Sequence, residues 1–251
     1  MGAPGPSPLG TWESTNPNPA KKNLDPLMNA ELRDHAAAFV LAGGQSSRMG
    51  RDKALLTLAG QPLIAHALAT LREAGLPAAI AGSRSDLASF APVLPDSKPG
   101  KQDSGPLAGI CAALASTSAR YVVFLSVDLP LLPSALLVYL LHHARITASA
   151  VTIPSVNGRA QTFPAVLDRD VLPFLEGELA ARRLGCLAAF QSAAAALGRP
   201  FRPVPVEYLV QAGQVAHPTS LPAAHWFLNL NTPADLERAE CLRQIRARSI
   251  A

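Results

Sequence analysis

The chain alternates between two hydrophobic patterns from about residue 36 onward. Short runs such as 121–127 are continuously apolar and rich in β-branched and aromatic residues, as in strands that are buried on both faces. Between these runs, apolar residues recur every three or four positions, for example at Leu63, Ala67 and Leu71, as on one face of a helix. The alternation predicts an α/β fold with a three-layer, doubly wound, mainly parallel, Rossmann-like sheet in a single domain.

Local signals set the bounds of the expected elements. Ser85 and Ser134 stand where helix N-caps are expected, and Thr232 followed by Pro233 is typical of a helix start. Asn157-Gly158 is a pair typical of a tight hairpin turn. We expect a strand starting at residue 36, further strands at 78–82, 121–127, 148–154 and 204–211, and helices at 62–74, 107–116, 134–144 and 233–247.

Composition narrows the classes of protein. Hydrophobic residues make up 49% of the chain and charged residues 16%, which suits a sheet covered on both faces. The net charge is +4, but the basic residues are dispersed and form no block with interleaved aromatic residues. This distribution favours mild attraction for phosphorylated ligands and argues against nucleic-acid binding. Cys111, Cys186 and Cys241 are widely separated, so neither a disulfide framework nor a zinc site is indicated and a reducing cytoplasm is expected.

Residues 1–34 differ from the rest of the chain. They are rich in proline and glycine and show almost no apolar periodicity. We therefore expect a disordered N-terminal tail at 1–34 and the folded domain at 35–248. No run approaches the roughly 18 apolar residues that a membrane-spanning helix requires, so no membrane attachment is expected.

A glycine-rich loop follows the first predicted strand, within the stretch AAAFVLAGGQSSRMGRDKALL at 36–56. Gly43 and Gly44 let the backbone turn with its N–H groups directed at an anion, and Arg48 and Lys53 add positive charge. The loop is neither a P-loop nor the dinucleotide fingerprint, because the residues that define those motifs are missing. The pattern predicts a phosphate-binding site.

Two later positions add candidate polar groups. Asp128 directly follows the predicted strand at 121–127, at the edge where open α/β sheets bind ligands. An Asp at this place can also simply cap a turn, and the residues alone do not decide between these roles. Helix capping accounts for Thr232 and Pro233 but leaves Asn229 and Asn231 without an explanation.

The motifs resemble those of the molybdenum cofactor guanylyltransferases, within the nucleotidyltransferase group. Residues 41–55 are similar to LAGGxSxRMGxDKAL, residues 128–133 to DxPxLP, and residues 229–236 to NxNTPxDL. The resemblance runs from Ala38 to about Glu240. It implies the nucleotidyltransferase fold and the transfer of GMP from GTP to Mo-molybdopterin, with release of pyrophosphate.

The resemblance also implies roles for individual residues. Mg²⁺ is the implied cofactor and Asp128 its ligand. GTP and molybdopterin are the implied ligands, and molybdoenzymes or cofactor-insertion proteins are candidate protein partners. The implied catalytic residues are Arg48, Lys53 and Asp128; the nucleotide-binding residues are Leu41, Ala42, Gly43, Gly44, Lys53, Asp96 and Asp128; and the acceptor-binding residues are Arg159, Gln161, Asn229 and Asn231.

One departure from the family pattern keeps alternatives open. Where the family often has an asparagine at the end of the second strand, this chain reads Ala81-Gly82-Ser83, so either Ser83 substitutes or that contact is absent. The alternatives are a cytidylyltransferase acting on the same pterin, another nucleotidyltransferase, and a catalytically silent nucleotide-binding accessory protein. The cytidylyl relatives tend to read LAAG, whereas residues 41–44 read LAGG, which favours guanine.

Overall fold

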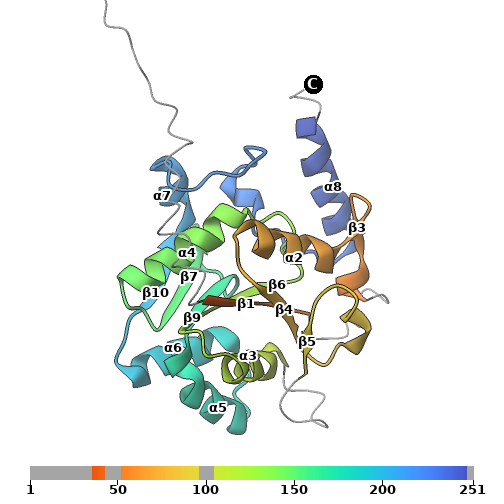
Figure 1. Cartoon of the computed structure of the whole chain (residues 1–251). Helices are drawn as coiled ribbons and strands as arrows, with labels where there is room; N and C mark the ends of the chain where they lie inside the picture. Colours follow the sequence, from red (N-terminus) through yellow and green to blue (C-terminus); the bar gives the residue numbers. More distant parts are fainter. Residues whose placement is uncertain (1–35, 43–51, 96–104, 248–251) are drawn as a thin grey trace, which may run out of the picture.

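A mixed sheet forms the centre of the protein. The structure, a computed structural model, describes residues 36–42, 52–95 and 105–247. In these residues seven strands lie in the order β10-β7-β9-β6-β1-β4-β5, and β8 pairs with β7 (Figure 1). The strands are β1 (Ala36–Leu41), β4 (Ala78–Ala81), β5 (Val93–Leu94), β6 (Tyr121–Ser126), β7 (Val151–Val156), β8 (Arg159–Ala160), β9 (Ala165–Asp168) and β10 (Phe201–Pro205); a separate two-stranded sheet contains β2 (Thr57–Leu58) and β3 (Gln61–Pro62).

Most strand pairs of the sheet are parallel. Strand β1 pairs in parallel with β4 and β6, β4 with β5, and β7 with β10. Strand β9 is antiparallel to both β6 and β7, and β8 is antiparallel to β7. The expected mainly parallel α/β sheet is therefore confirmed, with β9 inserted against the common direction.

Helices cover both faces of the sheet, as expected for three layers. Successive residues of β1 point to opposite faces, so Val40 packs in one core and Phe39 in the other. The predicted central strand is confirmed, because β6 lies mid-sheet and Phe124 is fully buried. One face carries α2 (Leu63–Glu73), α4 (Ser134–Ile146), α7 (Val206–Gln211) and part of α8 (Pro233–Ala247), and the other carries α3 (Gly105–Ser116), α5 (Leu172–Ala180) and α6 (Cys186–Leu197) (Figure 1).

The strand expected at 204–211 is wrong. Residues 201–205 form the edge strand β10 and residues 206–211 form α7, with Pro205 at the helix N-cap. Prolines are tolerated in an edge strand, whose outer N–H groups need no partner. Val204, Val206 and Leu209 are all buried, and the apolar spacing of a strand end followed by a short helix resembles that of a single strand.

Two predicted caps and one strand boundary are also wrong. Ser134 is the first residue of α4 and Pro133 is the N-cap, with no side-chain capping bond. Ser85 begins only a 3-10 turn, η3 (Ser85–Leu87), whose N-cap is Arg84. The strand expected at 148–154 begins at Val151, because Ala148 has a positive φ of 47° in the preceding turn.

Two turn predictions are confirmed. Asn157 and Gly158 have φ values of 50° and 72° between β7 and β8, as in the tight hairpin turn with two residues in the left-handed region. Thr232 caps α8, because its Oγ1 accepts a bond of 3.2 Å from the Asp235 N–H. Asp235 in turn accepts from the Thr232 N–H at 2.8 Å, so this helix start is held from both sides.

Asp168 is a fully buried carboxylate at the end of β9. It accepts hydrogen bonds from Arg199 Nη2 at 2.6 Å, Arg120 Nε at 3.0 Å and the Asp170 N–H at 3.0 Å. Burial alone raises the pKa of Asp168, but these hydrogen bonds outweigh it and the pKa lies below its usual value. Arg199 also donates to the Ala148 carbonyl, so the cluster joins β9 to the turn before β7.

We expect Asp168→Ala to lower the free energy of unfolding by about 3 kcal/mol, because it removes one partner of a buried ion-paired cluster. For a domain of this size the melting temperature should fall by about 6–12 °C. Asp170→Ala is the matched control: its side chain is 65% exposed and lies 3.3 Å from Arg199. An exposed pair contributes at most about 1 kcal/mol, so equal shifts in the two variants, measured by thermal unfolding, would contradict the structural role of Asp168.

Neither membrane spans nor disulfides occur in the part of the chain that the structure describes. None of its helices combines the length and the hydropathy that crossing a bilayer requires. The thiols of Cys111 and Cys186 are buried and that of Cys241 is exposed, and all three are free. The tail expected at 1–34 lies outside the described residues.

Candidate active site

Three parallel strands end together at one edge of the sheet. Beyond β1, the Ala42 N–H bonds the Ala81 carbonyl of β4 at 3.5 Å, and the Val127 N–H bonds the Leu41 carbonyl at 3.3 Å. The segments that follow β1, β4 and β6 therefore start side by side. This edge, at the carboxyl ends of parallel strands, is where open α/β sheets bind their ligands.

Lys53, Asp128 and Asn231 meet at this edge. Lys53 Nζ lies 3.2 Å from Asp128 Oδ2 and donates to Asn231 Oδ1 at 2.5 Å. The three residues are far apart in sequence, yet the fold brings them within hydrogen-bonding distance. The Lys53 and Asp128 side chains are 19% and 18% exposed, so both are largely shielded but reachable by a ligand.

Backbone and side-chain bonds fix the segments that carry Lys53 and Asp128. Lys53 opens a short 3-10 helix, η2 (Lys53–Leu55), in which Asp52 accepts from the Ala54 N–H at 3.0 Å. After this single turn the chain continues into β2. Asp128 Oδ1 accepts from Ser126 Oγ at 2.6 Å, and the Asp128 carbonyl accepts from the Leu230 N–H at 3.1 Å.

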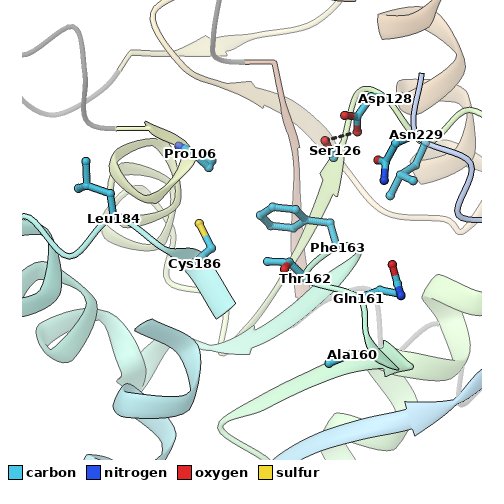
Figure 2. Close-up of a pocket in the computed structure, with 11 residues that line it drawn as sticks. Pro106, Ser126, Asp128, Ala160, Gln161, Thr162, Phe163, Leu184, Cys186 and Asn229 are labelled. Atoms are coloured by element: carbon cyan, nitrogen blue, oxygen red, sulfur yellow. Dashed lines mark hydrogen bonds between the residues drawn. The ribbon is translucent and has the colours of Figure 1, made fainter. Parts of the chain in front are cut away.

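A cavity of about 430 Å³ opens beside Asp128. Figure 2 shows Phe163 projecting into its middle, with Asp128 and Asn229 on one side and Cys186 on the other. Phe163 is itself braced by an edge-to-face contact with Phe190, at 6.4 Å between ring centroids. The lining residues are Pro106, Ser126, Asp128, Leu129, Ala160, Gln161, Thr162, Phe163, Leu184, Cys186 and Asn229.

The structure separates the four residues expected to bind the acceptor. Gln161 and Asn229 line the cavity, and the Gln161 backbone N–H is fixed by the Pro154 carbonyl at 2.8 Å. Asn231 lies at Lys53 rather than on the cavity wall. Arg159 is exposed on β8 and does not belong to the cavity lining.

The expected nucleotide-binding residues are described only in part. Leu41 and Ala42 are buried, at 6% and 3% exposure, and their roles in nucleotide binding stay predictions. Ser83 is exposed just after β4. The predicted positions Gly43, Gly44, Arg48 and Asp96 lie outside the described residues, and their roles stay predictions.

The donor set around Asp128 suits a metal that is shared with a substrate. Among the described residues, no group of three or more His, Cys, Asp or Glu side chains gathers to hold an ion. Asp128 offers one carboxylate, and the amide groups of Asn229 and Asn231 add neutral oxygens nearby. Mg²⁺ typically takes one or two carboxylates together with water and phosphate oxygens, so this set fits Mg²⁺.

Several residues of the site are not among those predicted from the sequence. Ser126 orients Asp128 through its hydrogen bond. The signal in the sequence was a polar residue at the end of a buried strand, two positions before Asp128. Phe163, Leu184 and Cys186 give the cavity its apolar wall, and no local sequence signal marks them. Arg84 donates a hydrogen bond to Asp52, the neighbour of Lys53. The sequence offered one signal for Arg84, namely a basic residue shortly after the predicted strand at 78–82.

Comparisons with known proteins find relatives over most of the chain. The sequence profile described as "MobA-like NTP transferase domain" matches residues 38–200. A relative from Rhizobium johnstonii, named molybdenum cofactor guanylyltransferase, is 34% identical over 221 residues, which cover 83% of this chain and 93% of the relative. A relative of the same name from Rhodobacter capsulatus is 34% identical over 212 residues, which cover 81% of this chain and 94% of the relative.

Solved structures share the fold. Molybdopterin-guanine dinucleotide biosynthesis protein A from Archaeoglobus fulgidus superposes with a TM-score of 0.66 at 23% identity, over 83% of this chain and 99% of that one. A cytidylyltransferase for 2-C-methyl-D-erythritol 4-phosphate from Thermus thermophilus superposes with a TM-score of 0.53 at 19% identity, over 82% and 98% of the two chains. At these identities the likeness concerns the fold alone.

Proposed function

Because the chain belongs to the MobA-like NTP transferase family, we propose that it transfers GMP from GTP to the phosphate of Mo-molybdopterin, forming the guanine dinucleotide of the cofactor and pyrophosphate. The observation that carries this proposal is the meeting of Lys53, Asp128 and Asn231 beside a cavity of about 430 Å³. The relatives that are 34% identical are named for this activity. The product is the cofactor form that molybdoenzymes or cofactor-insertion proteins would take up.

In the proposed reaction an oxygen of the acceptor's terminal phosphate attacks the α-phosphorus of GTP. The new bond joins that oxygen to the α-phosphorus, while the bond from the α-phosphorus to the bridging β-oxygen breaks and pyrophosphate leaves with the electron pair. A phosphate dianion is already nucleophilic and needs no general base. Catalysis is then a matter of positioning and of charge neutralisation.

Residues at the edge of the sheet would supply both the positioning and the charge neutralisation. The Lys53 ammonium, fixed between Asp128 and Asn231, is placed to stabilise the triphosphate and the leaving pyrophosphate. Asp128 and the neighbouring asparagine amides would hold Mg²⁺, which when bound supplies further positive charge at the phosphate oxygens. Ser126 keeps the Asp128 carboxylate in one orientation through its 2.6 Å hydrogen bond.

The cavity is the candidate site for the acceptor. Its wall combines an aromatic ring, Phe163, with apolar Leu184 and Cys186 and with the polar groups of Gln161 and Asn229 (Figure 2). An aromatic face with a few hydrogen-bonding groups suits a flat heterocycle such as a pterin. Asp128 lines the cavity and contacts Lys53, so an acceptor in the cavity would present its phosphate near the nucleotide.

We expect Gln161→Ala to raise the KM for the acceptor about 5- to 10-fold, because it removes one hydrogen-bonding side chain from the cavity. The KM for GTP should change less than twofold. Arg159→Ala is the matched comparison, since Arg159 precedes Gln161 by two residues but is not part of the lining. Steady-state rates at varied acceptor concentration measure both, and a larger effect of Arg159→Ala would place the acceptor elsewhere.

Calorimetric titration with GTP and with CTP, each with and without Mg²⁺, tests the proposal against its alternatives. The proposal expects tighter binding of GTP than of CTP, and binding that strengthens with Mg²⁺. Preference for CTP would favour a cytidylyltransferase. Binding of GTP without any transfer to the acceptor would favour a silent nucleotide-binding protein.

A further inference from the structure

The Arg84 guanidinium is fully occupied by contacts within the protein. Toward Asp86, Nε donates to Oδ1 at 2.9 Å and Nη2 to Oδ2 at 2.7 Å. Toward Asp52, Nη1 donates to Oδ1 at 3.1 Å and Nη2 to Oδ2. Nη1 also donates to the Ala42 carbonyl at 3.3 Å. The five contacts match the five N–H donors of an arginine.

Two of these partners bracket the segment between β1 and η2. Ala42 is the residue that follows β1, and Asp52 is the N-cap of η2 immediately before Lys53. Arg84 comes from a third place, the turn after β4, where Gly82 adopts a φ of 128° that residues with a side chain rarely use. One side chain therefore ties together the end of β1, the start of η2 and the end of β4.

We propose that Arg84 is a positioning residue that clamps Ala42 and Asp52 and thereby fixes the backbone around Lys53 for nucleotide binding. This inference rests on the proposed function, because it takes Lys53 to be the residue that meets the triphosphate. Arg84 acts through Asp52 and does not touch the nucleotide itself, since all of its donors have protein partners.

The geometry explains why an arginine is required. A planar guanidinium can form paired hydrogen bonds with two carboxylates at once, whereas a lysine ammonium has three donors on a single atom. The Arg84 side chain is only 13% exposed, so solvent competes weakly with these contacts. The hydrogen bond from Arg84 also lowers the pKa of Asp86, which keeps the Asp86 carboxylate ionised as a partner of the guanidinium.

The clamp also controls charge beside the site. Asp52 is an anion one residue from Lys53, and an unpaired carboxylate there would repel a triphosphate. The ion pair with Arg84 neutralises it, and Asp52 Oδ1 accepts hydrogen bonds both from Arg84 Nη1 and from the Ala54 N–H that it caps. Removing Arg84 would therefore release the backbone and expose a repulsive charge.

The test compares GTP affinity and steady-state kinetics in Arg84→Ala, Arg84→Lys and Asp52→Asn. We expect the dissociation constant and KM for GTP to rise at least 10-fold in Arg84→Ala and nearly as much in Arg84→Lys, with the acceptor KM changed less than threefold. Asp52→Asn keeps an oxygen for the cap and should raise them only about threefold. The double variant Arg84→Ala/Asp52→Asn should bind GTP no more weakly than Arg84→Ala, because both changes disrupt the same Arg84–Asp52 contact and the asparagine removes the exposed charge.

Arg199→Lys is the control for a purely structural role. Arg199 also bonds several partners, Asp168, Asp170 and two carbonyls, but at the opposite end of β6 from Asp128, where Asp168 pairs with Tyr121. We expect it to lower the melting temperature without changing the KM for GTP. If Arg84→Ala loses melting temperature like Arg199→Lys and keeps wild-type GTP affinity, the inference is overturned while the proposed function stands. If the wild-type protein itself binds no GTP, both are overturned.

Discussion

Replacing Lys53 with methionine is expected to lower kcat/KM for guanylyl transfer by about 10²–10³-fold, the usual effect of removing one preorganised electrostatic group from an active site. Methionine keeps an unbranched chain of similar length, so the change removes mainly the ammonium charge. In the structure that ammonium is held 3.2 Å from Asp128 and 2.5 Å from Asn231. Without it, both the triphosphate and the departing pyrophosphate lose a fixed positive partner.

Arg183→Met is the matched control for this experiment. Arg183 also forms an ion pair, with Glu178 at 2.6 Å, but its side chain is 65% exposed. Glu178 lies in α5, and Arg183 lies in the turn that follows this helix. Its loss should leave the transfer rate within twofold of the wild type. The assignment of Lys53 fails if Lys53→Met keeps activity within threefold while remaining folded, or if the two variants behave alike.

Replacing Asp128 with asparagine is expected to reduce kcat by about 10²–10³-fold and to weaken the apparent Mg²⁺ affinity. Replacing a residue that supports a metal ligand typically lowers the metal affinity 10- to 100-fold. Asp128 is itself the proposed ligand, so its replacement should lower the Mg²⁺ affinity by at least this factor. Asparagine has nearly the same shape and can still accept the hydrogen bond from Ser126. The loss therefore reports on the carboxylate charge and not on packing.

The measurement is the transfer rate as a function of Mg²⁺ concentration, compared with Asp170→Asn. Asp170 is also a carboxylate after a strand of the same sheet, but it is 65% exposed and pairs with Arg199. Its variant should show the wild-type Mg²⁺ dependence. An unchanged Mg²⁺ curve in Asp128→Asn would exclude Asp128 as the metal ligand.

The sequence predicted the layers of the fold well, because buried strands and amphipathic helices have distinct periods. Strand β6 and helix α2 follow from their apolar patterns within one or two residues. The errors concentrate where two short elements join, as at β10 and α7, whose combined apolar spacing resembles one strand. The antiparallel insertion of β9 could not be predicted either, since strand direction depends on contacts between distant segments.

For the site, the sequence could nominate residues but not their mutual arrangement. Lys53, Asp128 and Asn231 were predicted from separate motifs, and the structure brings them into direct contact. Arg84 was not predicted, because its role arises from Asp52 and Ala42, which become neighbours only in the folded chain. The apolar wall of the cavity was missed for the same reason, since Phe163 and Cys186 carry no motif.

The most direct test of the proposed function is to incubate the wild-type protein with Mo-molybdopterin, Mg²⁺ and GTP labelled at the α-phosphorus, and to follow the label. We expect the α-label to appear in a pterin dinucleotide while unlabelled pyrophosphate is released, and CTP to replace GTP poorly. Failure of the α-label to reach the pterin, or equal transfer from CTP, would contradict the proposed guanylyl transfer.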